Sequence, residues 1–157
     1  MKSNIADKVI LTDCDGVLLD WLFGFKEFMA ERGYTEQDDT GYAIWKRYGF
    51  INKEAGEGLV REFNNSAAMA YLTPHLDAVK YVKKLHEECG YVADKDDALE
   101  QYRGTGCVWV EDKYKNAVLG KELGLDSFMI DLPHNRQFDF DQRVQGWEDI
   151  YHTLVGI

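Results

Sequence analysis

Short apolar runs that end in pairs of acidic residues are the most constraining feature of this sequence. Residues 9–11 are aliphatic and are followed by Asp13 and Asp15, in the stretch KVILTDCDGVLLDW. A second apolar run, CVWV, ends in Glu111 and Asp112. Runs this short, apolar on both faces, are typical of buried strands in a parallel sheet. Ligands bind at the carboxyl ends of such strands, so the two acidic pairs are expected at one edge of the sheet.

Helical segments separate the apolar runs. Asp20 is expected to cap a helix that ends at Gly33, and Thr73 with the following proline is expected to begin a helix that ends at Gly90. The remaining expected elements are a helix over 113–123, a strand over 127–131 and a helix over 147–155. Strands that alternate with helices predict an α/β fold with a three-layer, Rossmann-like parallel sheet.

The segment 34–71 differs in composition and pattern from the rest of the chain. It is polar, rich in aromatic residues and helical in period, with Asn52 as an expected helix cap. We therefore expect two or three short helices there. The predicted domains are a core formed by 1–20 and 72–157, and a small helical cap over 21–71, inserted after the first strand.

Composition limits the partners of the chain. The 157 residues carry a formal net charge of −10, which argues against a nucleic-acid polymer as partner. The N-terminus lacks the apolar segment of a signal peptide, and no apolar run approaches the ~20 residues that span a membrane. Three cysteines without metal-type spacing predict reduced thiols and a cytoplasmic location. A homodimer remains open.

The clustered carboxylates raise an energetic problem. Burying several of them together costs several kcal/mol unless a cation compensates. Hard oxygen ligands suit Mg²⁺, so the two acidic strand ends predict a magnesium site. The alternative is that one pair caps a helix or is solvated. An acidic protein that handles an anionic substrate also needs a local positive element, either a metal ion or placed Lys and Arg residues.

Three motifs together resemble the haloacid dehalogenase-like (HAD) phosphohydrolase superfamily. DCDGVLLD resembles its first motif, hhhhDxDGhhhD, and VWVEDKYKNAVLGKELGL resembles its fourth motif, an acidic pair that closes a strand. ADKDDAL resembles the third motif, which supplies a lysine. Within the superfamily, EDK…NA…G…LG and DLPHNR are most similar to the 5'(3')-deoxyribonucleotidase-like branch, common in phage-type genomes.

The resemblance implies a Mg²⁺-dependent phosphatase for a small phosphate monoester, most simply a (deoxy)nucleoside monophosphate. Asp13 would be the nucleophile that forms an aspartyl-phosphate, and Asp15 would act as general acid and base. Lys95 would keep Asp13 ionised and pair with the phosphoryl group. Asp112 would bind the metal together with Asp13 and the backbone carbonyl of Asp15, with Glu111 beside it or acting through water.

Substrate contacts are expected from the first loop, the cap and the third clear strand. Gly16 would let the chain approach the phosphate closely, and cap aromatic residues could stack on a base. The candidate substrate-binding residues are Gly16, Trp21, Phe25, Trp45, Arg47 and Asn135. The alternatives are that the aromatic residues pack the helical lobe, that Arg47 is solvated and that Asn135 belongs to a polar turn following the strand, together with His134.

The chain departs from the family after the Thr73 helix. The family has a strand there that ends in Thr or Ser, but no Thr or Ser lies between Thr73 and Thr105. An internal stretch omitted between Val92 and Ala93 is the favoured explanation, since a true deletion would expose an edge of the first strand. Alternatively, residues 91–94 form a short strand that delivers Lys95 but no hydroxyl. A catalytically weak or silent HAD-like binding domain, or a phosphatase for another small metabolite, therefore remains open.

Overall fold

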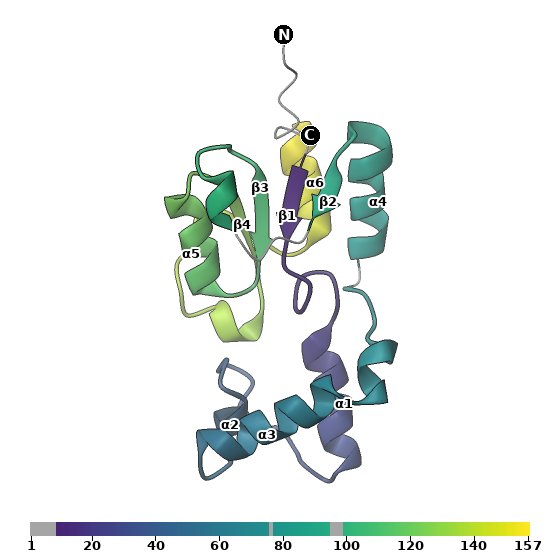
Figure 1. Ribbon diagram of the computed structural model, residues 1–157, viewed down its shortest axis with the longest axis vertical. Helices are drawn as coiled ribbons and strands as arrows, with labels where there is room; N and C mark the ends of the chain where they lie inside the picture. The colour runs from purple at the N-terminus through teal and green to yellow at the C-terminus, as the bar shows by residue number, and fades with distance from the viewer. Residues whose placement is uncertain (1–8, 76, 95–98) are drawn as a thin grey trace.

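The computed structural model describes residues 9–75, 77–94 and 99–157. Its upper body in Figure 1 is built on a five-stranded sheet in the order β2-β1-β3-β4-β5, in which every pair of neighbours is parallel. The strands are β1 (Val9–Thr12), β2 (Val92–Asp94), β3 (Val108–Glu111), β4 (Asp126–Ile130) and β5 (Arg143–Val144). The prediction of a parallel α/β sheet is confirmed.

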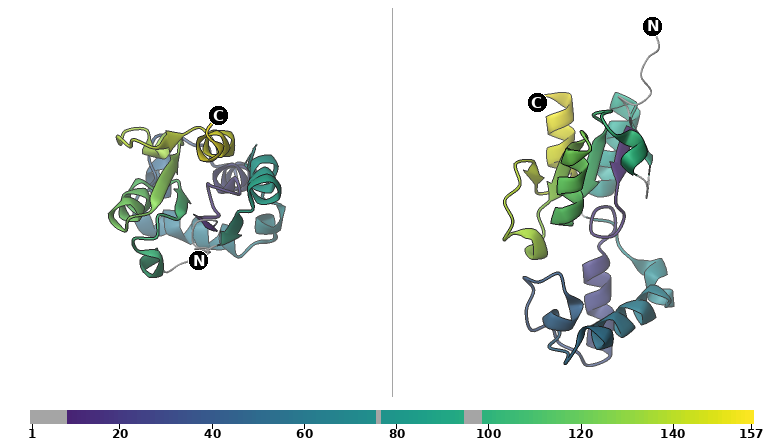
Figure 2. Two further views of the ribbon diagram at one scale, coloured as in Figure 1. Left: turned by 90° about the horizontal axis from the view of Figure 1, so that it is seen from above. Right: turned by 60° about the vertical axis from the view of Figure 1, so that its left-hand side comes forward.

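Helices cover both faces of this sheet (Figure 2). The helices of the core are α4 (Ala78–Cys89), α5 (Tyr114–Glu122) and α6 (Trp147–Val155). On one face, α4 and α6 bury residues such as Leu85 and Ile150 against Ile10, Val110 and Phe128 of the strands. On the other face, α5 packs over β3 and β4. The result is the three-layer arrangement that the alternating elements predict.

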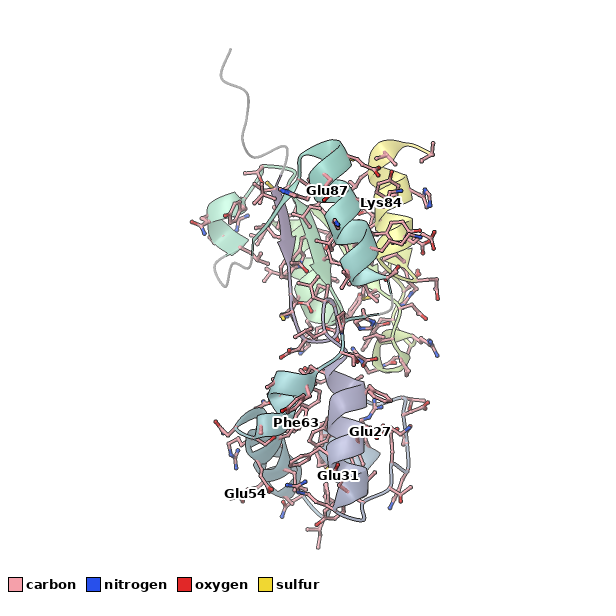
Figure 3. All side chains as sticks on the ribbon, turned by 90° about the vertical axis from the view of Figure 1, so that its right-hand side faces the viewer. Glu27, Glu31, Glu54, Phe63, Lys84 and Glu87 are labelled. Carbon is pink, nitrogen blue, oxygen red and sulfur yellow. The ribbon has the colours of Figure 1, made fainter. Side chains whose placement is uncertain are left out.

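The helical part below the sheet has a hydrophobic core of its own. Its elements are α1 (Trp21–Glu31), α2 (Ile44–Arg47), α3 (Lys53–Asn64) and a 3₁₀ turn (Ala67–Tyr71). Figure 3 shows Phe63 directed into this part, where it packs against Phe25 and Phe28. The Asp20 and Asn52 side chains cap α1 and α3 by accepting backbone N–H groups at 3.0 Å each, as the sequence predicts.

Two neighbouring chain segments join the helical part, hereafter the cap, to the sheet. Asp20 N donates to the Thr73 carbonyl at 2.8 Å, and Leu19 forms an antiparallel bridge with Pro74. The prediction that Thr73 begins a helix is therefore wrong, and α4 begins at Ala78. Residues 73 and 74 are extended, because their backbone pairs with Leu19 and Asp20, and this pairing is incompatible with the first turn of a helix.

Strand β2 resolves the question about residues 91–94. Val92 to Asp94 pair in continuous register with β1, from Val9↔Val92 to Leu11↔Asp94. The expectation that a chain of this length would leave β1 with an exposed edge is therefore wrong, because β1 lies between β2 and β3. The short strand, which was the alternative explanation, is the arrangement that the structure contains. Lys95 follows directly in the sequence but lies outside the described residues.

Strand β5 has no counterpart among the elements predicted from the sequence. Arg143 and Val144 extend the sheet by pairing with Met129 and Ile130 of β4. The other predicted elements have observed bounds within one or two residues of those expected, and α6 has the bounds predicted. No helix in the described part of the chain is both long and apolar enough to cross a bilayer.

Candidate active site

Adjacent parallel strands bring three carboxylates together at one edge of the sheet. Asp13 directly follows β1, Glu111 is the last residue of β3, and Asp112 comes next. The backbone N–H of Asp13 donates to the Val110 carbonyl at 3.0 Å, which fixes the two strand ends side by side. One carboxylate oxygen from each of the three acids lies within 4.8 Å of the others. This spacing suits a shared divalent cation.

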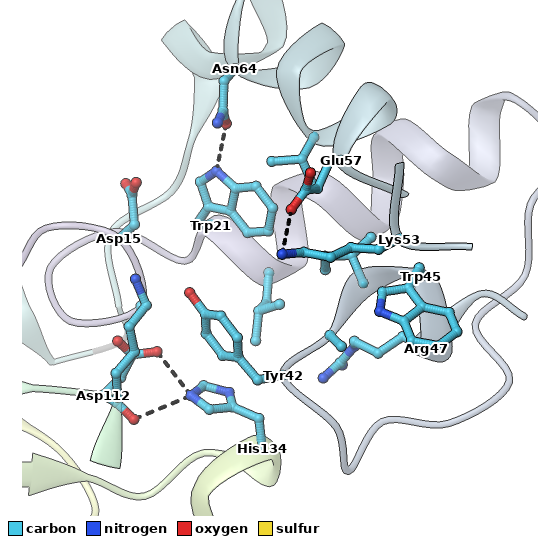
Figure 4. Close-up of a pocket in the computed structure, with 16 residues that line it drawn as sticks. Asp15, Trp21, Tyr42, Trp45, Arg47, Lys53, Glu57, Asn64, Asp112 and His134 are labelled. Carbon is cyan, nitrogen blue, oxygen red and sulfur yellow. Dashed lines mark hydrogen bonds and ion pairs between the residues drawn. The ribbon is translucent and has the colours of Figure 1, made fainter. Parts of the chain in front are cut away.

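Asp112 is buried and presents an unsatisfied oxygen. Its side chain is about 6% exposed, and Oδ1 has no hydrogen-bond partner among the described residues. Its other oxygen, Oδ2, lies 3.0 Å from Nε2 of His134, which also lies 3.2 Å from the Asp112 carbonyl (Figure 4). Both neighbours are acceptors, so Nε2 carries the proton and donates. A buried carboxylate oxygen without a donor is the feature that a bound cation would satisfy.

Glu111 differs from the other two acids. It is 1% exposed, and its Oε1 accepts the backbone N–H groups of Asp112 and Lys113 at 2.9 and 3.1 Å, while Oε2 accepts Asn116 Nδ2 at 2.8 Å. Burial is the main reason that the pKa of Glu111 is raised to about 8. The neighbouring Asp112 and Asp13 also raise this pKa, whereas the hydrogen bonds from Lys113 and Asn116 lower it. Glu111 therefore shapes the loop that carries Asp112, and it could also contribute one oxygen to a metal.

The loop after Asp13 packs tightly against Asp112. Gly16 has φ +81°, and a Cβ at this position would lie 2.7 Å from Oδ2 of Asp112, so only glycine fits without displacing the carboxylate. The N–H groups of Leu18 and Leu19 both donate to the Cys14 carbonyl at 2.9 Å, which closes the turn. The chain at Gly16 thus lies close to the carboxylate of Asp112, and its predicted close approach to a phosphate stays a prediction.

A cavity of about 520 Å³ lies between the acidic edge and the cap (Figure 4). The core lines it with Asp15, Gly16, Asp112, Lys113 and His134. The cap lines it with Trp21, Leu22, Tyr42, Ala43, Ile44, Trp45, Arg47, Lys53, Glu57, Val60 and Asn64. Cavities of about 300–1,000 Å³ hold small organic ligands. The core wall therefore consists mainly of ionisable side chains, and the opposite wall is largely aromatic and aliphatic.

The predicted substrate residues fall into two groups. Trp21, Trp45 and Arg47 line the cavity, although Arg47 is also buried and bound to Glu36. Phe25 is 1% exposed inside the cap core, where it stacks beneath Trp21 at 4.9 Å, so the structure supports the packing alternative for this residue.

Asn135 also lies away from the cavity lining. It is fully buried, and its Nδ2 donates to the carbonyls of Asp112 and Ile130 at 2.8 Å each. Its Oδ1 accepts Arg143 Nη1 at 2.7 Å. The expectation of a substrate contact from Asn135 is not met, because its amide nitrogen holds the Asp112 and Ile130 carbonyls and its amide oxygen is bound by Arg143. His134, expected beside it at the same edge, does line the cavity.

The two remaining catalytic candidates have different outcomes. Asp15 is exposed and lines the cavity, but its carboxylate is not part of the three-acid cluster. This position suits a group that exchanges protons with a substrate better than a side chain that binds the metal. Lys95 lies outside the described residues, so its predicted role is carried by the sequence alone.

Several lining residues were not singled out from the sequence. Lys53, Glu57, Val60 and Asn64 recur at helical spacing on α3, and this period could have revealed one face of the helix directed at the cavity. Tyr42 lies in a loop without such a signal. Its ring meets the ring of His134 edge-on at 5.2 Å, so the cap and the acidic edge are in direct contact.

Comparison with known proteins gives no activity. No family profile matches the chain. The chain is 32% identical over 102 residues to the "Uncharacterized 32.4 kDa protein in Gp30-rIII intergenic region" of Enterobacteria phage T4. The match covers 57% of this chain and 36% of the phage protein, so the chain spans about a third of that relative's length.

Proposed function

We propose that this protein is a Mg²⁺-dependent phosphatase of the HAD type that hydrolyses a small phosphate monoester, with a (deoxy)nucleoside monophosphate as the expected substrate. The observation that carries the proposal is the convergence of Asp13, Glu111 and Asp112 within 4.8 Å, with a buried, unpartnered oxygen on Asp112. Asp13, Asp112 and Glu111 would hold the ion. When bound, Mg²⁺ would neutralise charge on the carboxylates and on the phosphoryl oxygens.

The reaction would proceed in two displacements. In the first, a carboxylate oxygen of Asp13 forms a bond to phosphorus, the ester P–O bond breaks, and Asp15 gives its proton to the departing alkoxide. In the second, Asp15 takes a proton from water as the water oxygen bonds to phosphorus, and the bond to Asp13 breaks to release inorganic phosphate. The exposed position of Asp15 on the cavity wall supports this role.

The cap wall supports a nucleoside as the organic part of the substrate. Trp21 and Trp45 line the cavity opposite the acidic edge, and stacking of a base on an aromatic ring contributes about 1–3 kcal/mol. The indole N–H of Trp21 is already used by Asn64 Oδ1 at 2.9 Å, so this ring is fixed in place rather than free to donate to the substrate. Fixed rings lose little side-chain entropy on binding.

The test is phosphate release from a panel of nucleoside monophosphates and other small phosphate esters in the presence of Mg²⁺. The wild type should hydrolyse at least one ester, and Asp13→Asn should reduce this to background. Asp139→Asn is the matched control, because Asp139 is an exposed acid that does not line the cavity. Equal background rates in the wild type and Asp13→Asn would eliminate the phosphatase and favour a silent binding domain.

The role of Asp15 is tested separately. Asp15→Asn should lower turnover by about 10²–10⁴-fold, the usual contribution of a general acid–base group. Rapid quenching should then trap phosphate covalently on Asp13, because the second displacement lacks its base. Unchanged turnover in Asp15→Asn would remove Asp15 from the mechanism while leaving the nucleophile in place.

A further inference from the structure

Lys113 is a cavity residue to which neither the motifs nor the reaction above assign a role. It directly follows Asp112 and immediately precedes α5. Its backbone N–H donates to Glu111 Oε1 at 3.1 Å, so its position is fixed by the same loop that carries Asp112. Its side chain is half-buried and lines the cavity, with Nζ 5.3 Å from the centroid of the Tyr42 ring.

The other two cations of the described cavity lining form ion pairs with carboxylates of the cap, whereas Lys113 interacts with Tyr42 and lies near the carboxylates of Asp112 and Glu111. Arg47 is 5% exposed and pairs with Glu36 through Nε at 2.7 Å, while its Nη1 donates to two backbone carbonyls. Lys53 belongs to the cap and pairs with Glu57 at 3.1 Å. Among the described lining residues, Lys113 is thus the cation that the core contributes beside the acidic edge.

The charge at this edge favours a cation beside the metal, in addition to the predicted Lys95. A phosphate monoester is a dianion near neutral pH, and it must approach Asp13 and Asp112 in a chain of net charge −10. Two carboxylates cancel the charge of one divalent ion, so the metal alone leaves no surplus positive charge for the substrate. A lysine ammonium acts as a point charge toward phosphate oxygens and tolerates several directions of approach.

We propose that Lys113 binds the phosphate group of the substrate, reaching it from the acidic edge next to Asp112; this inference rests on the proposed phosphatase function. Lys113 and the metal would then contact the phosphate from the same side of the cavity. The organic part of the ester would extend toward Trp21 and Trp45 of the cap. Lys113 would have the same role toward inorganic phosphate, which shares the binding group of the substrate.

Binding of inorganic phosphate to the 157-residue chain, measured by calorimetry with Mg²⁺ present, tests the assignment. Lys113→Met keeps the aliphatic stem but removes the charge, and should weaken phosphate binding at least about tenfold. Lys113→Arg should retain most of the affinity. Lys115→Met, at an exposed position two residues on, is the matched control and should bind phosphate as the wild type does. Wild-type affinity for phosphate in Lys113→Met would overturn the proposal, whether or not Lys113→Arg keeps that affinity.

Titration with Mg²⁺ alone separates a charge effect from damage to the site. Removing a positive charge beside Asp112 should strengthen Mg²⁺ binding while phosphate binding weakens. A variant that merely distorts the loop would lose affinity for both, and this result in Lys113→Met would refute the assignment.

Failure of the phosphatase itself gives a different pattern. If the wild type binds phosphate through Lys113 but releases none from any ester above the Asp13→Asn background, the hydrolytic function fails and the binding role stands. If the wild type binds no inorganic phosphate with Mg²⁺ present, the binding role fails.

Discussion

Substitution of Asp112 by asparagine should stabilise the metal-free protein and abolish its response to Mg²⁺. Oxygens of Asp13 and Asp112 lie within 4.8 Å of each other. Two unit charges at this distance repel by about 3.5 kcal/mol at an effective dielectric constant of about 20. The introduced amide would keep an acceptor for His134 Nε2 and place an N–H donor near the carboxylate of Asp13. Because Asp13 is only half-buried and partly screened, we expect a gain in the free energy of unfolding of about 1–3 kcal/mol.

Thermal unfolding at neutral pH, with chelator and then with excess Mg²⁺, measures both effects. For a domain of this size, 1 kcal/mol corresponds to about 2–4 °C in Tm. Metal-free Asp112→Asn should therefore melt several degrees above the metal-free wild type. Mg²⁺ at about 100 times its Kd should stabilise the wild type by about 2.7 kcal/mol, and should leave Asp112→Asn unchanged.

The control is again Asp139→Asn, which removes one negative charge from an exposed site and should alter neither melting curve beyond about 0.5 kcal/mol. A metal-free Asp112→Asn that melts below the wild type would show that repulsion among the three carboxylates does not destabilise the metal-free protein, and the prediction would be refuted. It is equally refuted if the variant keeps the full Mg²⁺-induced rise in Tm.

Three further substitutions probe the supports of the acidic cluster. His134→Phe keeps a ring but removes the donor to Asp112, and should weaken Mg²⁺ binding about 10–100-fold by calorimetry; unchanged affinity would contradict this. Because the pKa of Glu111 is raised to about 8 in the fold and lies near 4.5 in the unfolded chain, the metal-free protein should lose up to about 5 kcal/mol of stability as pH rises from about 4.5 to 8. Glu111→Gln should remove this loss in urea titrations across that range, and an unaltered pH profile would be evidence against it. Gly16→Ala should lower Mg²⁺ affinity, whereas Gly104→Ala, at a similar φ of +70° with open space around it, should cost only backbone strain of about 1–3 kcal/mol. Equal Mg²⁺ affinity in both alanine variants would show that contact with Asp112 is unimportant.

The parts of the fold that sequence predicted well are those with a local physical signal. The β1 and β3 strands are apolar on both faces and end in acids, so their burial and their functional edge could both be inferred. Asp20 and Asn52 were recognisable as helix caps because their short side chains reach the backbone two or three residues on. Each of these inferences needs only a few neighbouring residues.

The parts that were missed depend on contacts between distant segments. Arg143 and Val144 are too few to give an alternating pattern, and they become a strand only because β4 offers a free edge. The helix signal of Thr73 and its proline was overridden by pairing with Leu19 and Asp20, more than fifty residues earlier. Asn135 was placed at the correct edge, but its partner could not be known without the three-dimensional path of the chain.

These long-range contacts explain how the acidic edge is held. Arg143 on β5 donates to Asn135 at 2.7 Å, and Asn135 donates to the carbonyl of Asp112 at 2.8 Å. The support of Asp112 therefore runs through Asn135 and Arg143 of the core. Cap residues such as Trp45 contact the cavity but do not contribute to this chain of hydrogen bonds. Under the proposed function, substitutions in the cap wall should consequently change the preference among esters. Substitutions along the hydrogen-bonded chain from Arg143 to Asp112 should instead change the affinity for Mg²⁺, to the same degree whichever ester is bound.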